Sequence, residues 1–268
     1  MPVARAAHFA ATLAVLCVTL WSIVRAPLPL GCSLGVAFAY LALTCLGVFF
    51  LRLRMYVDAV VRGPRGARGV ALTFDDGPHP VHTRRVLDAL DATGVKGTFF
   101  VIGKKAEEHP ELVREILARG HEVGLHSYAH DRLMSLRGGS RVRADLERGI
   151  EVLERITGSR PRIFRPPVGH TNPIIARVIS ELDLQVVGWS VGARDGLAGT
   201  TARDVLARVM PRARDGAIVL LHDAAELGER EPAGVAALPA LLERLAAERL
   251  DVVPLQDFLD TEEELASA

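Results

Sequence analysis

Two long stretches without a charged side chain open the sequence. Residues 6–24 and 26–51 contain no Asp, Glu, Lys or Arg, and Arg25 with a proline-containing turn separates them. Each stretch can supply the roughly 20 apolar residues that a helix needs to cross the hydrocarbon core of a bilayer. We therefore predict an N-terminal transmembrane helical hairpin, with helices over about 6–24 and 28–51.

Two other interpretations of this N-terminal region remain open. A single membrane anchor would use one stretch, and a cleaved secretory signal would use Arg5 and the first stretch as its basic and apolar regions. The second stretch favours the hairpin, because a cleaved signal has no use for it. Arginines follow the second stretch closely, and the positive-inside rule would then leave both ends of the hairpin in the cytoplasm. These arginines are Arg52, Arg54, Arg62, Arg65 and Arg68.

From residue 69 onward, short apolar segments alternate with longer amphipathic segments. In residues 140–157, apolar side chains recur at three- and four-residue spacing, which is the period of a helix with one buried face. Asn172 followed by Pro173 is typical of a helix N-cap with proline at the first helical position. The apolar segments that we expect to form strands are 69–75, 97–102, 121–126, 162–165, 185–191, 217–222 and 251–255.

Strands that alternate with helices predict an α/β fold with a parallel sheet and right-handed crossovers. We expect a distorted parallel (β/α) barrel of about seven strands, with an open doubly wound sheet as the alternative. The sequence contains no glycine-rich phosphate-binding motif of the dinucleotide or P-loop type, so a nucleotide site is not expected. The chain then divides into a membrane anchor (1–54), a juxtamembrane linker rich in Gly and Arg (55–68) and a soluble domain (69–268).

Charge and composition exclude several classes of protein. The 32 basic and 32 acidic side chains give no basic excess, so a general nucleic-acid binder is not indicated. Hydrophobic residues make up 49% of the chain, which excludes a disordered protein. All three cysteines lie in the apolar stretches, so the soluble domain has neither a disulfide nor a cysteine zinc site. The uncharged stretches also lack the charged residues that would mark a transport pathway.

Polar side chains suited to chemistry follow the ends of five predicted strands. They are Asp75 with Asp76, His126, Arg165, Asp195 and His222. The carboxyl ends of the strands of a parallel barrel share one face, where the active sites of barrel enzymes lie. Five such ends converging on one face favour an enzyme over a binding module.

The pair His126 and His130 predicts a metal site. On a helical turn, two histidines four residues apart present their imidazoles to the same side. One carboxylate from Asp75 and Asp76 would complete a three-ligand site with open positions. Successive side chains of a strand point to opposite faces, so one carboxylate would bind the metal while the other stays free as a base. Metal-assisted hydrolysis is the chemistry that this combination supports.

Three further polar residues complete this chemistry. His222, on another strand, would be the general acid that protonates the leaving group. Asp195 would hold a histidine in its useful tautomer. Arg165 would pair with the base and fix its position.

Four motifs occur in the order found in the NodB-type polysaccharide deacetylases, carbohydrate esterase family 4, which the chain therefore resembles. They are Thr73-Phe74-Asp75-Asp76-Gly77-Pro78, His126-Ser127-x-x-His130, Arg165-Pro166-Pro167-Val168-Gly169 and Leu220-Leu221-His222. The resemblance covers about residues 68–260. It implies a distorted (β/α) barrel and one divalent metal ion, expected to be zinc, with cobalt, nickel and manganese as alternatives. It also implies removal of N- or O-acetyl groups from amino sugars.

The resemblance assigns roles to single residues. Asp75 matches the general base and Arg165 the residue that tethers it. His222 matches the general acid, and Asp195 the residue that orients the catalytic histidine. The implied metal ligands are Asp76, His126 and His130.

The resemblance also implies substrate contacts. The backbone N–H of Val168 matches a group that holds the oxyanion, Leu220 matches the wall of the acetyl pocket, and Pro167 belongs to the same substrate-binding motif. Gly192 and Gly196 stand where many members carry Asp and Trp, so we expect a different sugar-binding groove.

These observations predict a membrane-anchored, metal-dependent hydrolase of the cell envelope that removes N-acetyl (or O-acetyl) groups from an amino-sugar glycan. A deformylase or deacetylase of a polyprenyl-linked sugar is an alternative. A non-catalytic glycan-binding membrane protein is another, although it would require a missing ligand or base. The expected partners are an N-acetylated glycan or lipid-linked sugar and a lipid bilayer, without nucleic acid. The membrane side of the catalytic domain stays open, since the resemblance favours the outside and the arginines favour the cytoplasm.

Overall fold

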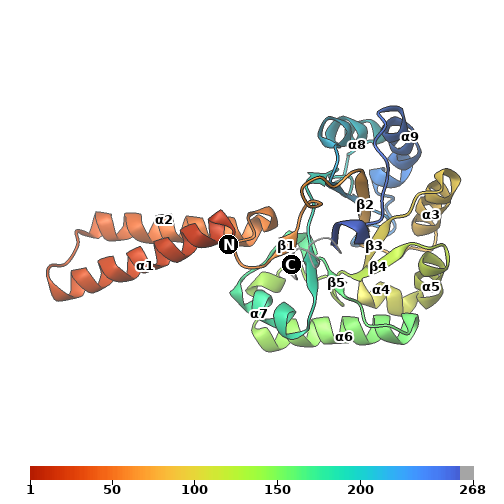
Figure 1. Cartoon of the computed structure of the whole chain (residues 1–268). Helices are drawn as coiled ribbons and strands as arrows, with labels where there is room; N and C mark the ends of the chain where they lie inside the picture. Colours follow the sequence, from red (N-terminus) through yellow and green to blue (C-terminus); the bar gives the residue numbers. More distant parts are fainter. Residues whose placement is uncertain (260–268) are drawn as a thin grey trace.

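A parallel sheet of eight strands curls into an incomplete barrel with helices around its outside (Figure 1). This is a computed structural model, and it describes residues 1–259. The expected end of the soluble domain at residue 268 lies outside the described residues. Along the sheet the strand order is β1-β6-β5-β4-β3-β2-β8-β7, and every pairing is parallel. The strands are β1 (Ala59–Val60), β2 (Val70–Asp75), β3 (Thr98–Val101), β4 (Glu122–Leu125), β5 (Ile163–Phe164), β6 (Gln185–Val187), β7 (Val191–Gly192) and β8 (Ala217–His222).

The two edges of the sheet approach each other because the chain passes between them within three residues. Strand β6 lies near one edge beside β1, whereas β7 forms the opposite edge beside β8. Between them, the Gly188 N–H donates to the Val60 carbonyl (2.8 Å) and the Ser190 N–H donates to the Ile218 carbonyl (3.0 Å). This short connection therefore brings the two edges of the incomplete barrel toward each other and holds the strand ends on a single rim.

Three expected elements differ from the structure. The segment 185–191 is divided into β6 and β7 by the connection just described. The segment 251–255 forms a single bridge between Val252 and Val70, and Pro254 lacks the N–H that a continuing ladder would require. The segment 55–68, expected as a linker, contributes β1 to the sheet, and its residue Val57 is buried in the core.

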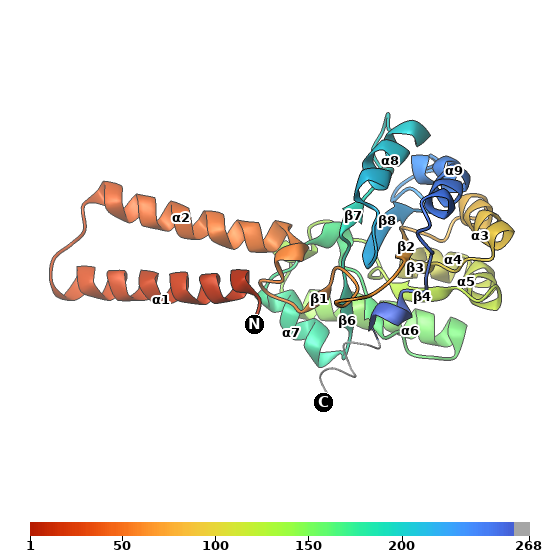
Figure 2. The same cartoon turned by 45° about the horizontal axis from the view of Figure 1, so that its top comes forward.

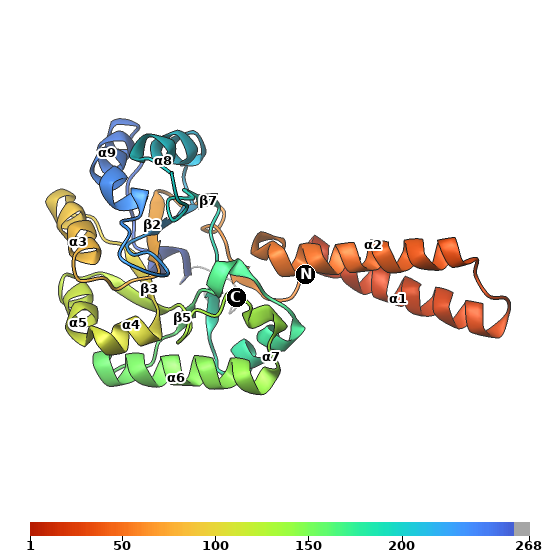
Figure 3. The same ribbon diagram turned by 180° about the vertical axis from the view of Figure 1, so that it is seen from behind.

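Helices cover the outer surface of the sheet (Figures 1 and 3). Helix α6 confirms the periodicity of residues 140–157. Helix α7 begins as predicted, because the Asn172 side chain accepts a hydrogen bond from the Ile175 N–H (2.8 Å) and Pro173 follows. The helices are α1 (Val3–Val24), α2 (Leu30–Phe49), α3 (His82–Thr93), α4 (Gly103–Glu108), α5 (Pro110–Ala118), α6 (Gly139–Thr157), α7 (Pro173–Glu181), α8 (Ala202–Val209) and α9 (Ala233–Ala247), with 3₁₀ turns η1 (Leu51–Leu53), η2 (Met134–Leu136), η3 (Pro167–Gly169) and η4 (Met210–Arg212).

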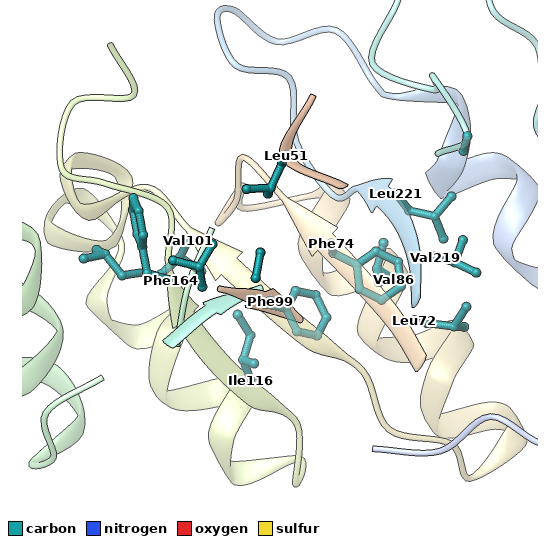
Figure 4. Close-up of a cluster of buried hydrophobic side chains, with 14 of the residues drawn as sticks. Leu51, Leu72, Phe74, Val86, Phe99, Val101, Ile116, Phe164, Val219 and Leu221 are labelled. Atoms are coloured by element: carbon teal, nitrogen blue, oxygen red, sulfur yellow. The ribbon is translucent and has the colours of Figure 1, made fainter. Parts of the chain in front are cut away.

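The core lies between the sheet and the helices, and the central strands are buried on both faces (Figure 4). All six residues of β2 are buried, as expected for an inner strand of a parallel sheet. The rings of Phe74 and Phe99, from neighbouring strands, stack with centroids 5.0 Å apart. This packing fixes the backbone of β2 up to Asp75, where the strand ends.

Helices α1 and α2 form an antiparallel hairpin that projects from one side of the domain (Figures 1 and 2). Almost none of their surface is buried, and their length and composition fit membrane spans and equally a signal sequence. Contacts at the base hold the hairpin on the domain. The Arg5 guanidinium binds both carboxylate oxygens of Asp58 (3.0 and 3.1 Å), and the Thr171 N–H donates to the Val48 carbonyl (3.2 Å).

Candidate active site

A cavity of about 1050 Å³ lies at the carboxyl ends of the barrel strands. Its lining includes Asp75 at the end of β2 with Asp76 directly after it, His126 and His130 after β4, and His222 at the end of β8. Two more predicted residues, Arg165 and Asp195, contact members of this lining through their side chains. The convergence of strand ends that the sequence predicts is therefore present.

Asp76, His126 and His130 form a buried cluster that could hold a metal ion. The Asp76 Oδ1 atom lies 3.5 Å from His126 Nε2 and 3.3 Å from His130 Nε2, and it accepts no hydrogen bond from a described residue. Burial lowers the pKa of His126, which favours its neutral ring. Its Nδ1 lies 2.7 Å from the Arg165 carbonyl, so Nδ1 carries the proton and Nε2 presents a lone pair. Lone pairs on a carboxylate and an imidazole then face each other, which fits a shared cation.

The loop of residues 126–130 differs from the expected helical turn. It is irregular, and Ser127 and His130 both have a positive φ. The His130 N–H donates to the Ser127 Oγ (2.9 Å), and Asp145 of α6 accepts two backbone N–H groups of the loop at 3.0 Å each. The two imidazoles are therefore brought together by a clamped loop, with ring centroids 4.8 Å apart.

The two neighbouring carboxylates are not separated by strand alternation. Strand β2 ends at Asp75, and Asp76 has a φ of 73°, which turns its side chain back toward the same cavity. His126 Nε2 consequently lies 3.7 Å from Asp75 Oδ2 as well as close to Asp76. Different partners distinguish the two side chains, since Asp75 also contacts an arginine.

That arginine is Arg165, which is fully buried inside the barrel. Its Nη1 donates to Asp75 Oδ1 (2.7 Å) and to Thr73 Oγ1 (2.9 Å). Its remaining donors reach the carbonyls of Val187 (3.2 Å) and Gly188 (2.9 Å). One oxygen of Asp75 is thus fixed by a charged hydrogen bond, and the other faces the cavity.

His222 and Asp195 form a second charged pair on the other side of the cavity. The His222 Nδ1 lies 2.9 Å from Asp195 Oδ1, and the His222 N–H donates to Asp195 Oδ2 (2.8 Å). Burial opposes the charged ring, but the hydrogen bond and charge of Asp195 raise the pKa of His222 to about 9. The Nε2 of His222 points to the region of Asp76, 4.0 Å from Oδ2. The imidazole that Asp195 holds through Nδ1 therefore presents Nε2 to the cluster of Asp76, His126 and His130.

The predicted substrate residues are distributed unevenly. Val168 and Leu220 line the cavity, and Val168 has a left-handed conformation (φ 51°, ψ 11°). Pro167 is buried in η3, whereas its neighbour Pro166 lines the cavity. The expected substrate contact of Pro167 stays a prediction.

Sequence analysis missed several residues of the site. Glu226 lies 3.2 Å from His130 Nδ1. Lys105 Nζ donates to the carbonyls of Asp76 (2.8 Å) and Ala225 (2.6 Å), which ties the β2 end to the loop after β8. Trp189 lines the cavity. A Trp within a strand-end motif is a signal that was available, whereas Lys105 and Glu226 occur in no spacing pattern that would identify them.

Comparisons with known proteins agree with this geometry. A sequence model of the family described as polysaccharide deacetylase matches residues 62–187. A peptidoglycan-N-acetylglucosamine deacetylase of Bacillus cereus is 32% identical over 202 residues, which cover 75% of this chain and 72% of the relative. A chitooligosaccharide deacetylase of Sinorhizobium fredii is 37% identical over 169 residues, covering 63% of this chain and 78% of the relative.

Solved structures show the same fold. The crystal structure of a peptidoglycan N-acetylglucosamine deacetylase superposes with a TM-score of 0.69 at 30% identity, covering 74% of this chain and 91% of that chain. A pseudoenzyme of carbohydrate esterase family 4 from Bacillus anthracis has a TM-score of 0.68 at 25% identity, covering 77% of this chain and 71% of that chain. On its motifs, its fold and its relatives, the chain belongs to the polysaccharide deacetylase family, carbohydrate esterase family 4, a family of metal-dependent hydrolases that act on amide C–N bonds.

Proposed function

We propose that the protein hydrolyses the N-acetyl group of an amino sugar in a cell-envelope glycan. The observation that carries this proposal is the buried cluster of Asp76, His126 and His130, which lies beside a separate carboxylate and an imidazole paired with an aspartate. Two similar proteins are named for peptidoglycan and chitooligosaccharide substrates, which makes an N-acetylated glycan the substrate class to propose.

Asp76, His126 and His130 are the proposed ligands of one divalent ion. Two imidazoles and a carboxylate suit zinc, and also cobalt, nickel or manganese. When bound, the ion would supply Lewis acidity toward water and the acyl carbonyl. Asp145 and the Arg165 carbonyl hold the two histidines in place before any ion arrives.

Asp75 is the proposed general base. Its Oδ1 is occupied by Arg165, so the Oδ2 oxygen that faces the cavity is the atom that takes a proton from water. The water oxygen then bonds to the acyl carbon. Because Arg165 is buried and also hydrogen-bonded to the carbonyls of Val187 and Gly188, Asp75 keeps this orientation without reorganising during the reaction.

His222 is the proposed general acid. Its raised pKa keeps Nε2 protonated near neutral pH, and that proton passes to the sugar nitrogen as the C–N bond breaks. Acetate and a free amine are the products. Asp195 is a positioning residue, because it fixes the Nδ1 proton and the ring orientation.

Val168 and Leu220 are the proposed acyl-binding residues. The left-handed backbone at Val168 presents this part of η3 to the cavity, where its N–H would stabilise the developing oxyanion. Leu220 supplies an apolar wall for the acetyl methyl group.

The proposed anchor is the α1–α2 hairpin, with residues 1–54 as the membrane unit and the rest of the chain as the catalytic unit. The exposed apolar surface of both helices supports it, since a soluble domain would bury such surface. Removal of an acyl group from a lipid-linked sugar is the second candidate function. It is favoured by the position of the hairpin, whose base lies on the domain beside η3.

Removal of one imidazole should weaken metal binding. We expect the full-length protein to bind about one divalent ion, and His126→Ala or His130→Ala to lower the affinity by at least about 10-fold. His109→Ala is the matched control, since His109 lies between α4 and α5, outside the cavity. Metal content after dialysis measures the effect. Equal metal loss in all three variants would contradict the ligand assignment.

The two carboxylates should behave differently on substitution. Asp75→Asn should retain metal while turnover falls about 10²–10⁴-fold, because the base is lost. Asp76→Asn should lose metal, with activity partly restored by excess metal. His222→Ala should resemble Asp75→Asn, since the amine then leaves without its proton donor.

Acetate release and metal content, measured on the same preparations, separate these variants. Metal loss in Asp75→Asn but not in Asp76→Asn would reverse the assignment. Unchanged turnover in all three would show that the cluster is structural.

The hairpin should behave as an integral membrane element. The full-length protein should sediment with membranes and resist washing with concentrated salt, because two uncharged helices would be buried in hydrocarbon. The mature N-terminus, read by mass spectrometry, distinguishes an anchor from a cleaved signal. Release by salt alone, or loss of residues 1–24, would contradict the two-span anchor.

A further inference from the structure

The candidate active-site cavity extends to the end of helix α2. Phe49, Phe50 and Arg52, which end this helix and begin η1, line the same cavity as Asp75 and His222. The contact is fixed, because the Phe49 ring meets the His170 ring edge to face with centroids 4.9 Å apart. A substrate in this cavity therefore reaches the point where the proposed membrane span ends.

Arginines surround this cavity in excess over acids. The lining contains Arg52, Arg132, Arg194, Arg212 and Arg230. Its acids are Asp75 and Asp76, already used in the site, and Glu226, which lies near His130 (3.2 Å) and Arg132 (3.6 Å).

Four of these arginines have no anionic partner among the described residues, and one of the four, Arg230, donates to the Gly196 carbonyl. Arg52, Arg194 and Arg212 are exposed, and none of them forms an ion pair with a residue in the described part of the chain. Guanidinium groups bind phosphate oxygens in a planar, two-pronged geometry, which makes this rim suited to an anionic substrate.

Exposed apolar side chains share the rim with the arginines. Phe49 is 53% exposed, Phe50 44%, Leu197 58% and Leu227 84%, and all four line the cavity. A neutral, soluble glycan would require neither the positive charge of the unpaired arginines nor so much exposed apolar surface. A molecule with a sugar, a phosphate and a hydrocarbon chain would match all three features: the sugar would bind at the site, the phosphate at the arginines and the hydrocarbon chain along the apolar rim.

We infer that the substrate is an acetylated amino sugar joined through a phosphate or diphosphate to a membrane lipid. The acetyl group lies at Asp75 and His222, the phosphate contacts the unpaired rim arginines, and the lipid chain follows the rim toward α2. This inference rests on the proposed deacetylation and on α2 being a membrane span. The phosphate of a nucleotide sugar offers the same charge, so the lipid is what the test must distinguish.

The experiment uses full-length protein in phosphatidylcholine vesicles and measures acetate release from three substrates. They are a polyprenyl diphosphate N-acetylglucosamine in the same vesicles, UDP-N-acetylglucosamine in solution and neutral N-acetylchitotetraose in solution. We expect the lipid-linked sugar to react fastest. Arg194→Gln and Arg212→Gln should each lower the ratio of its kcat/KM to that of the neutral oligosaccharide by about 10-fold. Arg114→Gln, on the exposed face of α5, is the matched control and should leave the ratio unchanged.

Each alternative outcome contradicts a separate step. Equal rates with the lipid-linked and the neutral sugar would overturn the inference that the substrate is anionic. Equal losses of kcat/KM on these two substrates in the arginine variants would overturn it as well. If the nucleotide sugar reacts as fast as the lipid-linked sugar, the inference that the substrate carries a lipid is wrong. Acetate from the neutral oligosaccharide alone would leave the proposed deacetylation standing and overturn the inference. Acetate from no substrate would contradict both.

Discussion

The buried ion pair between Arg165 and Asp75 is the interaction on which the rest of the site depends. Arg165 extends from the end of β5 across the barrel, where it contacts β2 through Asp75 and the end of β6 through the Gly188 carbonyl. Its guanidinium also lies 4.1 Å from the centre of the Phe100 ring of β3. Removing one partner of a buried ion pair destabilises a protein by about 3–5 kcal/mol, because the other charge is left buried and unpaired. Arg165 and Asp75 therefore each require the other. The pair joins three strand ends into one rim while it aims the free oxygen of Asp75 at the cavity.

The cluster of Asp76, His126 and His130 that could hold a metal ion lies on less regular structure than the barrel around it. Asp76 and His130 both have positive φ values, which are unfavourable for side chains with a Cβ, and they persist because surrounding contacts fix the backbone. Lys105 holds the Asp76 carbonyl, and Asp145 holds the loop that carries His130. Local backbone conformations of this kind are common at functional sites, where the surrounding structure holds them in place. The barrel brings the strand ends to one rim, and the contacts of Lys105 and Asp145 fix the positions of Asp76 and His130 on that rim.

The sequence predicted the parts of this molecule that follow from periodicity and from strand ends. The parallel α/β barrel, helix α6, the N-cap at Asn172 and the convergence of Asp75, His126 and His222 all follow from such patterns. It did not predict the division of 185–191, the entry of β1 from the expected linker, or the loop at His130, because these depend on hydrogen bonds between residues distant in sequence.

Asp75 is the proposed general base, and Arg165 is proposed to act through it. The most direct measurement is the turnover of Arg165→Lys, Asp75→Asn and the double variant, with metal content and thermal unfolding checked in each. If Arg165 acts by holding Asp75, the double variant loses no more turnover than Asp75→Asn alone, because the residue that Arg165 positions is already absent. Losses that multiply in the double variant would show that Arg165 acts on the reaction by a separate route, and they would contradict this account.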